Sequence, residues 1–136
     1  MSKNMYKKVI SMILAAVMVL GVPCGVYANT VETSTKVYES KTVTATSGVA
    51  KTNTTYSNGS CTAVSGASSS CHISFWLVDK YGKVATNTNC YTTTSEKQAL
   101  VYKSGYGMTG YLYYACARIV TGSATTSTTL KYKLTP

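Results

Sequence analysis

Apolar and polar side chains alternate with a period of two along most of the chain after residue 40. This spacing predicts β-strands, because successive strand residues point to opposite faces of a sheet. The last strand shows the pattern most clearly: Leu130, Tyr132 and Leu134 point one way, and Lys131 and Lys133 point the other. A sheet that is buried on one face produces this alternation, and almost no stretch of the chain has the 3.6-residue period of a helix.

The same pattern predicts further strands, and residues 29–40 form either a flexible lead-in or a first strand. Turn signals recur every 8–12 residues or so, with Asn58-Gly59 as the strongest hairpin signal. The segment 111–120 is apolar on both faces apart from Arg118, so we expect it to lie centrally. We therefore predict an all-β fold, a small antiparallel two-sheet β-sandwich of about seven strands. A small closed β-barrel is the alternative. The other expected strands are 41–46, 71–78, 83–91 and 97–103.

The N-terminus has the three-part layout of a secretory signal. Three lysines in the first eight residues precede the apolar run 9–22, and Val26 and Ala28 then place small or apolar residues at the two positions that a signal peptidase reads. We expect residues 1–28 to be a signal peptide that is cleaved after Ala28, which makes the mature protein secreted. A run of about 14 apolar residues is shorter than the roughly 20 that a membrane-spanning helix needs, so no stable anchor is expected. Lipidation at Cys24 is disfavoured by the preceding Pro23.

Four cysteines remain after this cleavage: Cys61, Cys71, Cys90 and Cys116. An even number in a small exported chain predicts two disulfides, and sequence leaves three pairings open. The short turn-like segment after Cys61 favours Cys61–Cys71, which leaves Cys90–Cys116. With no Cys-x-x-Cys pair and one histidine, a zinc site is disfavoured, and we expect no metal or other cofactor.

The mature chain is basic, rich in hydroxyl groups and aromatic. Ten basic side chains against four acidic ones give it a net charge of +6, and ten tyrosines remain. We expect residues 41–136 to form one domain that attracts an anionic envelope polymer, a carbohydrate or a secreted protein, with no nucleic-acid partner. Candidate anion-binding residues are Arg118, Lys131 and Lys133. The two lysines would equally serve as a charged sheet edge that prevents aggregation.

A catalytic constellation is not expected. His72 is the only histidine, and Asp79 is predicted to lie at the opposite end of the same strand. Asp79 and Glu96 are the acids available for a carboxylate pair, and both fall in predicted turns. The glycines of residues 105–110 match a dinucleotide fingerprint in spacing, but a strand follows them, so we interpret them as a loop. The chain is therefore predicted not to be an enzyme.

Trp76 lies on the strand face opposite the main apolar set, and three tyrosines cluster nearby in sequence. Trp76, Tyr111, Tyr113 and Tyr114 together are a candidate platform on which sugar rings would stack. The alternative is that they fill the core, or occupy strand positions that aromatic residues favour.

Three segments carry a resemblance to a known group of proteins. They are Cys-His-Ile-Ser-Phe-Trp-Leu-Val-Asp-Lys-x-Gly-Lys, Gly-Tyr-Leu-Tyr-Tyr-Ala and the closing Tyr-x-Leu-Thr-Pro, all within residues 71–136. Their layout resembles small secreted β-sandwich proteins of Gram-positive bacteria, some of which look like lactococcin-type bacteriocins. The resemblance implies an extracellular, non-enzymatic role and lends no site residues.

The leading expectation is a secreted, non-catalytic, cationic protein that binds a cell-envelope or extracellular polymer, with a bacteriocin-like effector as one form of it. A protein inhibitor of a secreted hydrolase is the second hypothesis, since a small disulfide-closed domain makes a rigid platform. A small extracellular enzyme that depends on His72 is the third.

Overall fold

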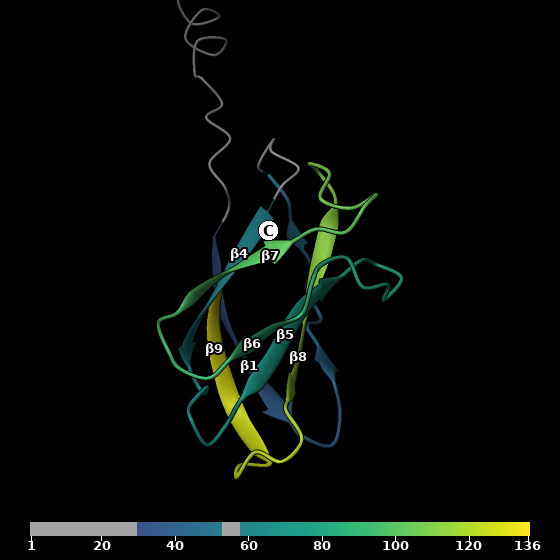
Figure 1. Ribbon diagram of the computed structural model, residues 1–136. Coiled ribbons are helices and arrows are strands. Elements are labelled where there is room, and N and C mark those ends of the chain that lie inside the picture. The colour runs from purple at the N-terminus through teal and green to yellow at the C-terminus, as the bar shows by residue number, and fades with distance from the viewer. Residues whose placement is uncertain (1–29, 53–57) are drawn as a thin grey trace, which may run out of the picture.

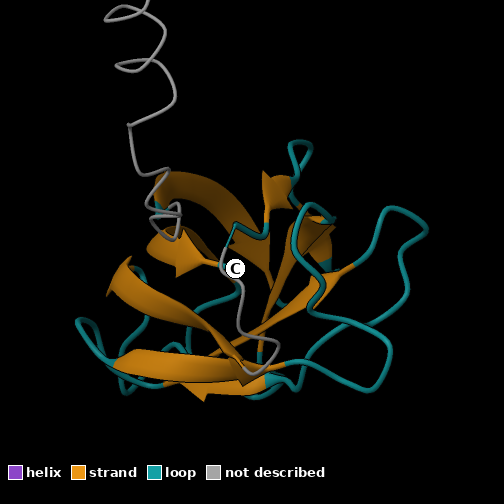
Figure 2. Ribbon diagram, turned by 90° about the horizontal axis from the view of Figure 1, so that it is seen from above, coloured by secondary structure: helices purple, strands orange, loops and turns teal. Residues whose placement is uncertain are grey.

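Two antiparallel sheets stack on one another in the computed structural model, which describes residues 30–52 and 58–136 (Figures 1 and 2). Nine strands form within these residues, where about seven were expected, and there is neither a helix nor a closed barrel. The two-layer, all-β prediction is therefore confirmed, and the barrel alternative is wrong. Sheet A has the order β1 (Val31–Tyr38), β9 (Ser127–Thr135), β4 (Asn58–Ser65) and β7 (Lys97–Val101). Sheet B has the order β2 (Val43–Thr44), β8 (Leu112–Ile119), β5 (Ile73–Val78) and β6 (Asn89–Tyr91), and β3 (Val49–Ala50) also pairs with β8.

Strand β8 is central in sheet B, as its apolar character on both faces predicts. It pairs with β5 along one side and with β2 and β3 along the other. The short strands β2 and β3 are two pieces of one edge, interrupted at residues 45–48. The N-terminal segment 31–38 is a strand and not a flexible lead-in, because it pairs along its whole length with β9 (Figure 1).

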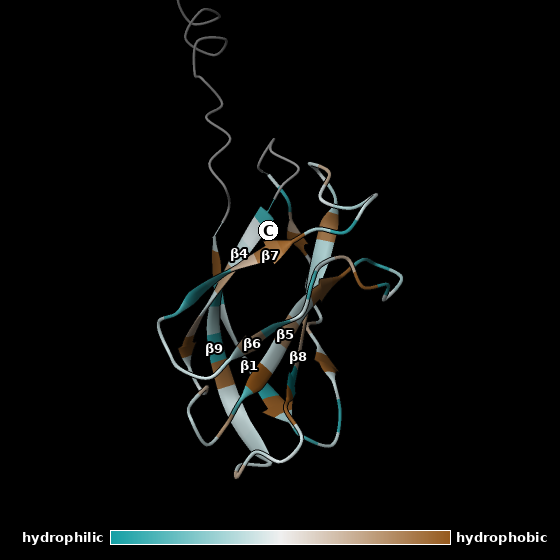
Figure 3. Cartoon of the chain, viewed as in Figure 1, coloured by the Kyte–Doolittle hydropathy of each residue, from teal (hydrophilic) through white to brown (hydrophobic). Residues whose placement is uncertain are grey.

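Alternate residues of both sheets fill the core between them. Figure 3 shows the alternation along β9, where Leu130, Tyr132 and Leu134 are each about 1% exposed. Phe75 of β5, the single phenylalanine, packs edge-on against Tyr132 of sheet A with ring centres 5.0 Å apart. It also packs edge-on against Tyr91 of β6, at 6.3 Å. One buried ring thus joins both sheets.

The expected hairpin at Asn58-Gly59 is wrong, since these two residues begin β4 and pair with Val101 and Leu100 of β7. A side chain at Gly59 would place its Cβ 2.8 Å from the carbonyl oxygen of Thr135. This glycine therefore permits the close approach of the C-terminal strand and makes no turn. The residues before it, 53–57, lie outside the described part of the chain.

The expected strand 83–91 is shorter in the structure, where only Asn89–Tyr91 forms β6. Before it, Val84 and Thr86 form isolated bridges with Val78 and Tyr102, and two side chains accept hydrogen bonds from backbone amides. The Leu77 amide donates to Thr86 Oγ1 at 3.0 Å, and the Val101 amide donates to Asn87 Oδ1 at 2.7 Å.

The predicted disulfides are absent, because all four described cysteines are free thiols. Cys90 and Cys116 lie on the same outer face of sheet B, opposite Ser74 and Trp76 of β5. The full width of β5 separates them, about 10 Å at the usual strand spacing, whereas a disulfide needs Cα atoms within about 7 Å.

The pairing of Cys61 with Cys71 fails for a different reason. Strand β4 continues through Ser65, so Cys61 lies four residues before its end, inside the ladder. The chain turns later, at Gly66, and Cys71 forms an isolated bridge with Ser68. Both thiols are buried in the core as small apolar side chains.

The predicted signal peptide, its cleavage site at Ala28 and Cys24 lie outside the described residues. Among residues 30–52 and 58–136, no helix has the length and apolar character that a membrane span requires.

Alkylation with iodoacetamide followed by peptide mapping should separate the four thiols. Cys90 is exposed, so we expect it to be labelled in the folded protein. Cys61, Cys71 and Cys116 should be labelled only after unfolding, because each is buried and burial raises the pKa of each thiol. Labelling of Cys61 as fast as Cys90, or peptides linked through two of these sulfurs, would contradict the structure.

The protein should lose stability in alkali. Burial raises the pKa of the Cys61 thiol and of the Tyr132 hydroxyl to about 12, and it also raises the pKa of Tyr91 and Tyr102. In the unfolded chain these groups ionise near pH 8.5 and 10, so the folded state holds protons that the unfolded state releases. Stability should be complete below about pH 8.5 and should fall as the pH rises toward 12.

Denaturant midpoints measured from pH 7 to 11 test this expectation. Tyr132→Phe should flatten the decline above pH 10, and Tyr81→Phe, at an exposed tyrosine, should leave it unchanged. A midpoint that stays constant up to pH 11 would contradict the burial of these hydroxyls.

Candidate functional site

A groove lined by four tyrosines, Tyr81, Tyr106, Tyr111 and Tyr113, opens at one end of the sandwich. It lies between the turn that follows β5 and the glycine-rich loop that precedes β8, and its volume is 670 Å³. We call it the tyrosine groove and define it by Lys80, Tyr81, Lys83, Tyr106, Tyr111 and Leu112. Tyr81 is 74% exposed and Tyr111 is 57% exposed, so both present their rings to solvent.

Asp79 builds the first wall of the groove. Its Oδ1 accepts hydrogen bonds from the amides of Tyr81 at 2.8 Å and Lys83 at 2.9 Å, which fixes the turn. Gly82 completes this turn with a φ of 77°, a conformation that favours glycine. The turn holds Tyr81 out from the sheet, and the Nζ atom of Lys80 lies 4.9 Å from the Tyr81 ring centre.

The glycine-rich loop builds the second wall. Gly105, Gly107 and Gly110 have φ values of 85°, 84° and 86°, so the spacing that mimics a dinucleotide motif serves a loop, as expected. The Gly107 amide donates to the Tyr113 hydroxyl at 2.7 Å, and the Gly110 amide donates to the Lys51 carbonyl at 2.8 Å. These bonds fix the loop against the core, and Tyr106 lies between two of its glycines.

The four aromatic residues of the predicted platform do not share one surface. Tyr111 lies in the tyrosine groove, and Tyr113 points into the core with 1% exposure. Trp76 and Tyr114 are diagonal neighbours on the outer face of sheet B, because their partners across the ladder are Cys116 and Val78. The sequence prediction thus identified two residues that line the groove, Tyr111 and the largely buried Tyr113.

Tyr81 and Tyr106 were missed as site residues, although the sequence contains a signal for them. Each stands next to a glycine in a turn or loop, where backbone geometry does not need an aromatic side chain. A large apolar ring at such a position is expected to be exposed, and exposed aromatic groups that gather together mark binding surfaces.

The three candidate anion-binding residues also separate. Lys131 and Lys133 lie on the outer face of sheet A, and their Nζ atoms are 2.8 and 3.6 Å from the Glu32 carboxylate oxygens. The hydrogen bond and then the charge of Lys131 lower the pKa of Glu32. Arg118 lies on sheet B, where its Nε donates to the Glu39 carbonyl at 2.8 Å.

Lysines beside the groove are not neutralised in this way. Within residues 30–52 and 58–136, the only ion pairs are the two that Glu32 makes. Lys80 and Lys83 therefore keep their charge available at the mouth of the groove, while the nearby Asp79 carboxylate is occupied by backbone amides.

The residues considered for catalysis stay apart. His72 and Asp79 flank β5 at opposite ends, about 20 Å apart along the strand. The His72 amide donates to Ser123 Oγ at 3.3 Å, and Glu96 contacts Thr93 in the turn before β7. No group of three or more His, Cys, Asp or Glu side chains suited to a metal ion occurs in the described residues.

Lys51 lies beneath the groove and is fully buried, at 0% exposure. Among the described residues, its Nζ atom has no hydrogen-bond partner, and it lies 5.0 Å from the ring centre of Tyr102. The Tyr102 hydroxyl is also buried without a partner in this part of the chain. Burial lowers the pKa of Lys51, since a desolvated ammonium ion is unfavourable.

Replacing Lys51 with Met should stabilise the protein. The ring contact is worth up to about 2 kcal/mol when desolvated, whereas a buried ammonium without a hydrogen bond costs more, so removal should gain about 1 kcal/mol at pH 7. The gain should shrink as the pH approaches about 10.4, where the amine of the unfolded chain is also neutral.

Chemical denaturation of the Lys51→Met variant at pH 7 and pH 10 measures both effects. Lys103→Met, at an exposed lysine beside the same loop, is the control and should change stability little. A clear loss of stability in Lys51→Met at pH 7 would show that the amine has a partner.

The tyrosine groove therefore combines exposed aromatic rings, unpaired ammonium groups and a rigid backbone frame. Its one carboxylate, that of Asp79, accepts hydrogen bonds within the turn. The single histidine, His72, lies at the other end of β5. No protein-family model, no curated protein and no solved structure matches the chain.

Proposed function

We propose that this is a secreted, non-catalytic protein that binds an anionic polymer of the cell envelope or extracellular matrix through the tyrosine groove. A bacteriocin-like effector that attaches to a target cell is one role that such binding would serve. The ligand class is a carbohydrate-containing chain that carries phosphate or carboxylate groups.

The observation that supports this proposal most strongly is the exposure of Tyr81 and Tyr111 on the two sides of one groove. An aromatic ring that stays exposed to water forgoes the favourable free energy of burying its apolar surface, and a partner that covers the ring would supply it. Sugar rings have apolar faces that pack on aromatic rings, and a tyrosine hydroxyl remains available for hydrogen bonds at the edge. The fixed walls limit the entropy lost on binding.

The charge distribution supports an anionic partner. Lys80 and Lys83 lie at the groove without a carboxylate partner in the described residues, and ammonium groups bind phosphate as point charges. The net charge of +6 on the expected mature chain would steer an anionic polymer toward the protein at low salt.

Binding to purified Gram-positive cell walls tests the proposal. The double variant Tyr81→Ala/Tyr111→Ala should weaken retention at least tenfold, because each ring contributes on the order of 1 kcal/mol or more. Tyr114→Ala, at a tyrosine on the outer face of sheet B, is the matched control and should bind as the unaltered protein does.

A salt series separates the stacking and ionic contributions. Lys80→Gln/Lys83→Gln should reduce the salt dependence of retention and should leave the aromatic contribution in place. Equal retention of the double tyrosine variant and the control, or no retention of the unaltered protein at low salt, would overturn the proposal.

A further inference from the structure

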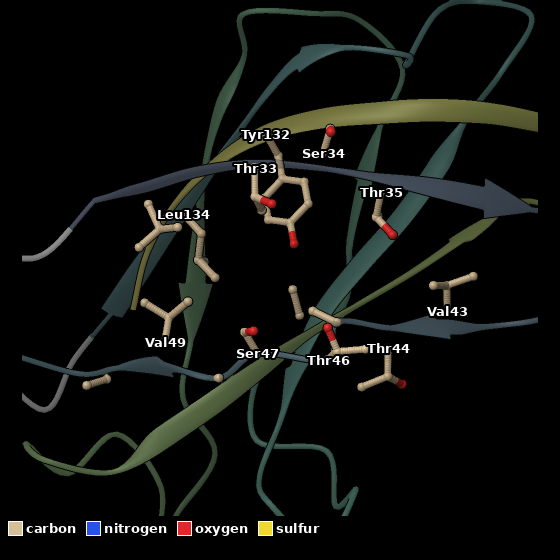
Figure 4. Close-up of a pocket in the computed structure, with 15 residues that line it drawn as sticks. Thr33, Ser34, Thr35, Val43, Thr44, Thr46, Ser47, Val49, Tyr132 and Leu134 are labelled. Atoms are coloured by element: carbon tan, nitrogen blue, oxygen red, sulfur yellow. The ribbon is translucent and has the colours of Figure 1, made fainter.

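A second hollow lies between the edges of the two sheets. It has a volume of 410 Å³ and lies between β1 of sheet A and the β2–β3 edge of sheet B (Figure 4). We call it the interstrand slot and define it by residues 33–35, residues 43–50 and Tyr132.

Main chain forms both rims of this slot. Consecutive residues line it, at positions 33–35 and 43–50. Successive side chains of a strand point to opposite faces of the sheet, so consecutive residues can line one hollow only along the edge of the strand, where the main chain is exposed. Strand β1 is the last strand of sheet A, and β2 and β3 have β8 on one side only within the described residues. Each rim therefore offers a row of backbone amide and carbonyl groups to whatever enters the slot.

The side chains around the slot carry hydroxyl groups and no charge. Edge strands are usually protected from pairing by charged side chains, prolines or bulges, and residues 43–50 contain no charge and no proline. On β1 the neighbouring Glu32 points away and pairs with Lys131 on the outer face of sheet A. The hydroxyl groups belong to Thr33, Ser34, Thr35, Thr44, Thr46 and Ser47.

Tyr132 closes the floor of the slot and points its hydroxyl group into it (Figure 4). The residue is 1% exposed and lies directly across the ladder from Thr33. The buried Tyr91 hydroxyl donates to the Cys61 carbonyl at 2.7 Å, whereas the Tyr132 hydroxyl lines the slot, where it can donate to a molecule that enters.

We infer that the interstrand slot binds an extended, uncharged peptide segment of a partner protein, which adds as a strand alongside the β1 and β2–β3 edges. An extended peptide presents donors and acceptors along both of its edges, which matches two main-chain rims. Its inward side chains would lie over Leu134 and Ala115, and a backbone carbonyl would accept from the Tyr132 hydroxyl. A saccharide fits less well, because the buried Tyr132 ring offers no exposed face for stacking. This inference does not depend on the function proposed for the tyrosine groove.

A capped six-residue peptide of alternating threonine and valine, labelled through a flexible linker, is the probe. Fluorescence anisotropy should detect its binding to the full protein. The same peptide with every second backbone nitrogen methylated should bind at least tenfold more weakly, because methylation removes main-chain donors and keeps the side chains. Equal binding of the two peptides, or no binding of the unmethylated one at millimolar concentration, would overturn the inference.

Two variants locate the site. Tyr132→Phe should weaken binding about fivefold through the loss of one hydrogen bond, and Thr33→Lys should weaken it more than tenfold by placing a charge in the slot. Thr94→Lys, in the exposed turn before β7, makes the same change outside the slot and should have no effect. Near-ultraviolet circular dichroism checks that each variant is folded.

Unchanged binding by Thr33→Lys, or displacement of the peptide by a neutral hexasaccharide, would also overturn the inference. Tyr81→Ala/Tyr111→Ala should bind the peptide normally, and Thr33→Lys should bind cell walls normally. These crossed measurements distinguish failure at the slot from failure at the groove.

Discussion

The edge-on contact between Phe75 and two tyrosines holds the two sheets together. Phe75 lies 5.0 Å from Tyr132 of sheet A and 6.3 Å from Tyr91 of sheet B, and the Tyr91 hydroxyl donates to the Cys61 carbonyl of sheet A at 2.7 Å. Each aromatic side chain buries roughly 150–250 Å², or several kcal/mol at about 25 cal/mol/Å². Aromatic packing and one buried hydrogen bond therefore connect the two sheets. The predicted disulfides are absent, and Cys61 and Cys71 act as small core residues.

Sequence periodicity predicted the strands whose environment is set locally. Strands β5, β8 and β9 appear as expected. The burial of one face of a strand, or of both faces for β8, produces a pattern of apolar residues within a few consecutive positions, which the sequence shows directly. The errors arise where the structure of a segment depends on a strand that is distant in the sequence. Gly59 looks like a turn residue until the C-terminal strand lies against it, and the separation of Cys90 from Cys116 depends on β5 passing between them. The pattern of apolar and polar residues does not show which strands pair with one another in the sheets.

The same limit explains the candidate site. The groove exists because the ladder between β5 and β8 pairs Val78 with Tyr114, which brings the turn after β5 beside the loop before β8. Tyr81 and Tyr111 are thereby placed on two sides of one hollow, although 30 positions separate them in the chain. Tyr111 was one of the aromatic residues of the predicted platform, and Tyr81 carries the signal of a ring beside a turn glycine. That the two rings meet at one groove required the strand register.

Polar groups that the core leaves unsatisfied lie beside the glycine-rich loop that frames the tyrosine groove. The Lys51 amine and the Tyr102 hydroxyl are buried without partners among the described residues, and the Lys51 carbonyl accepts from Gly110 of this loop. The buried Tyr91 hydroxyl, which lies in the core away from the groove, is paired with the Cys61 carbonyl, as buried polar groups usually are. Natural sequences break the rules of packing and polar pairing mainly where function requires it, at a cost in stability that the rest of the core offsets. The two exceptions beside the glycine-rich loop are therefore an argument, independent of exposure and shape, for the binding site proposed at the tyrosine groove.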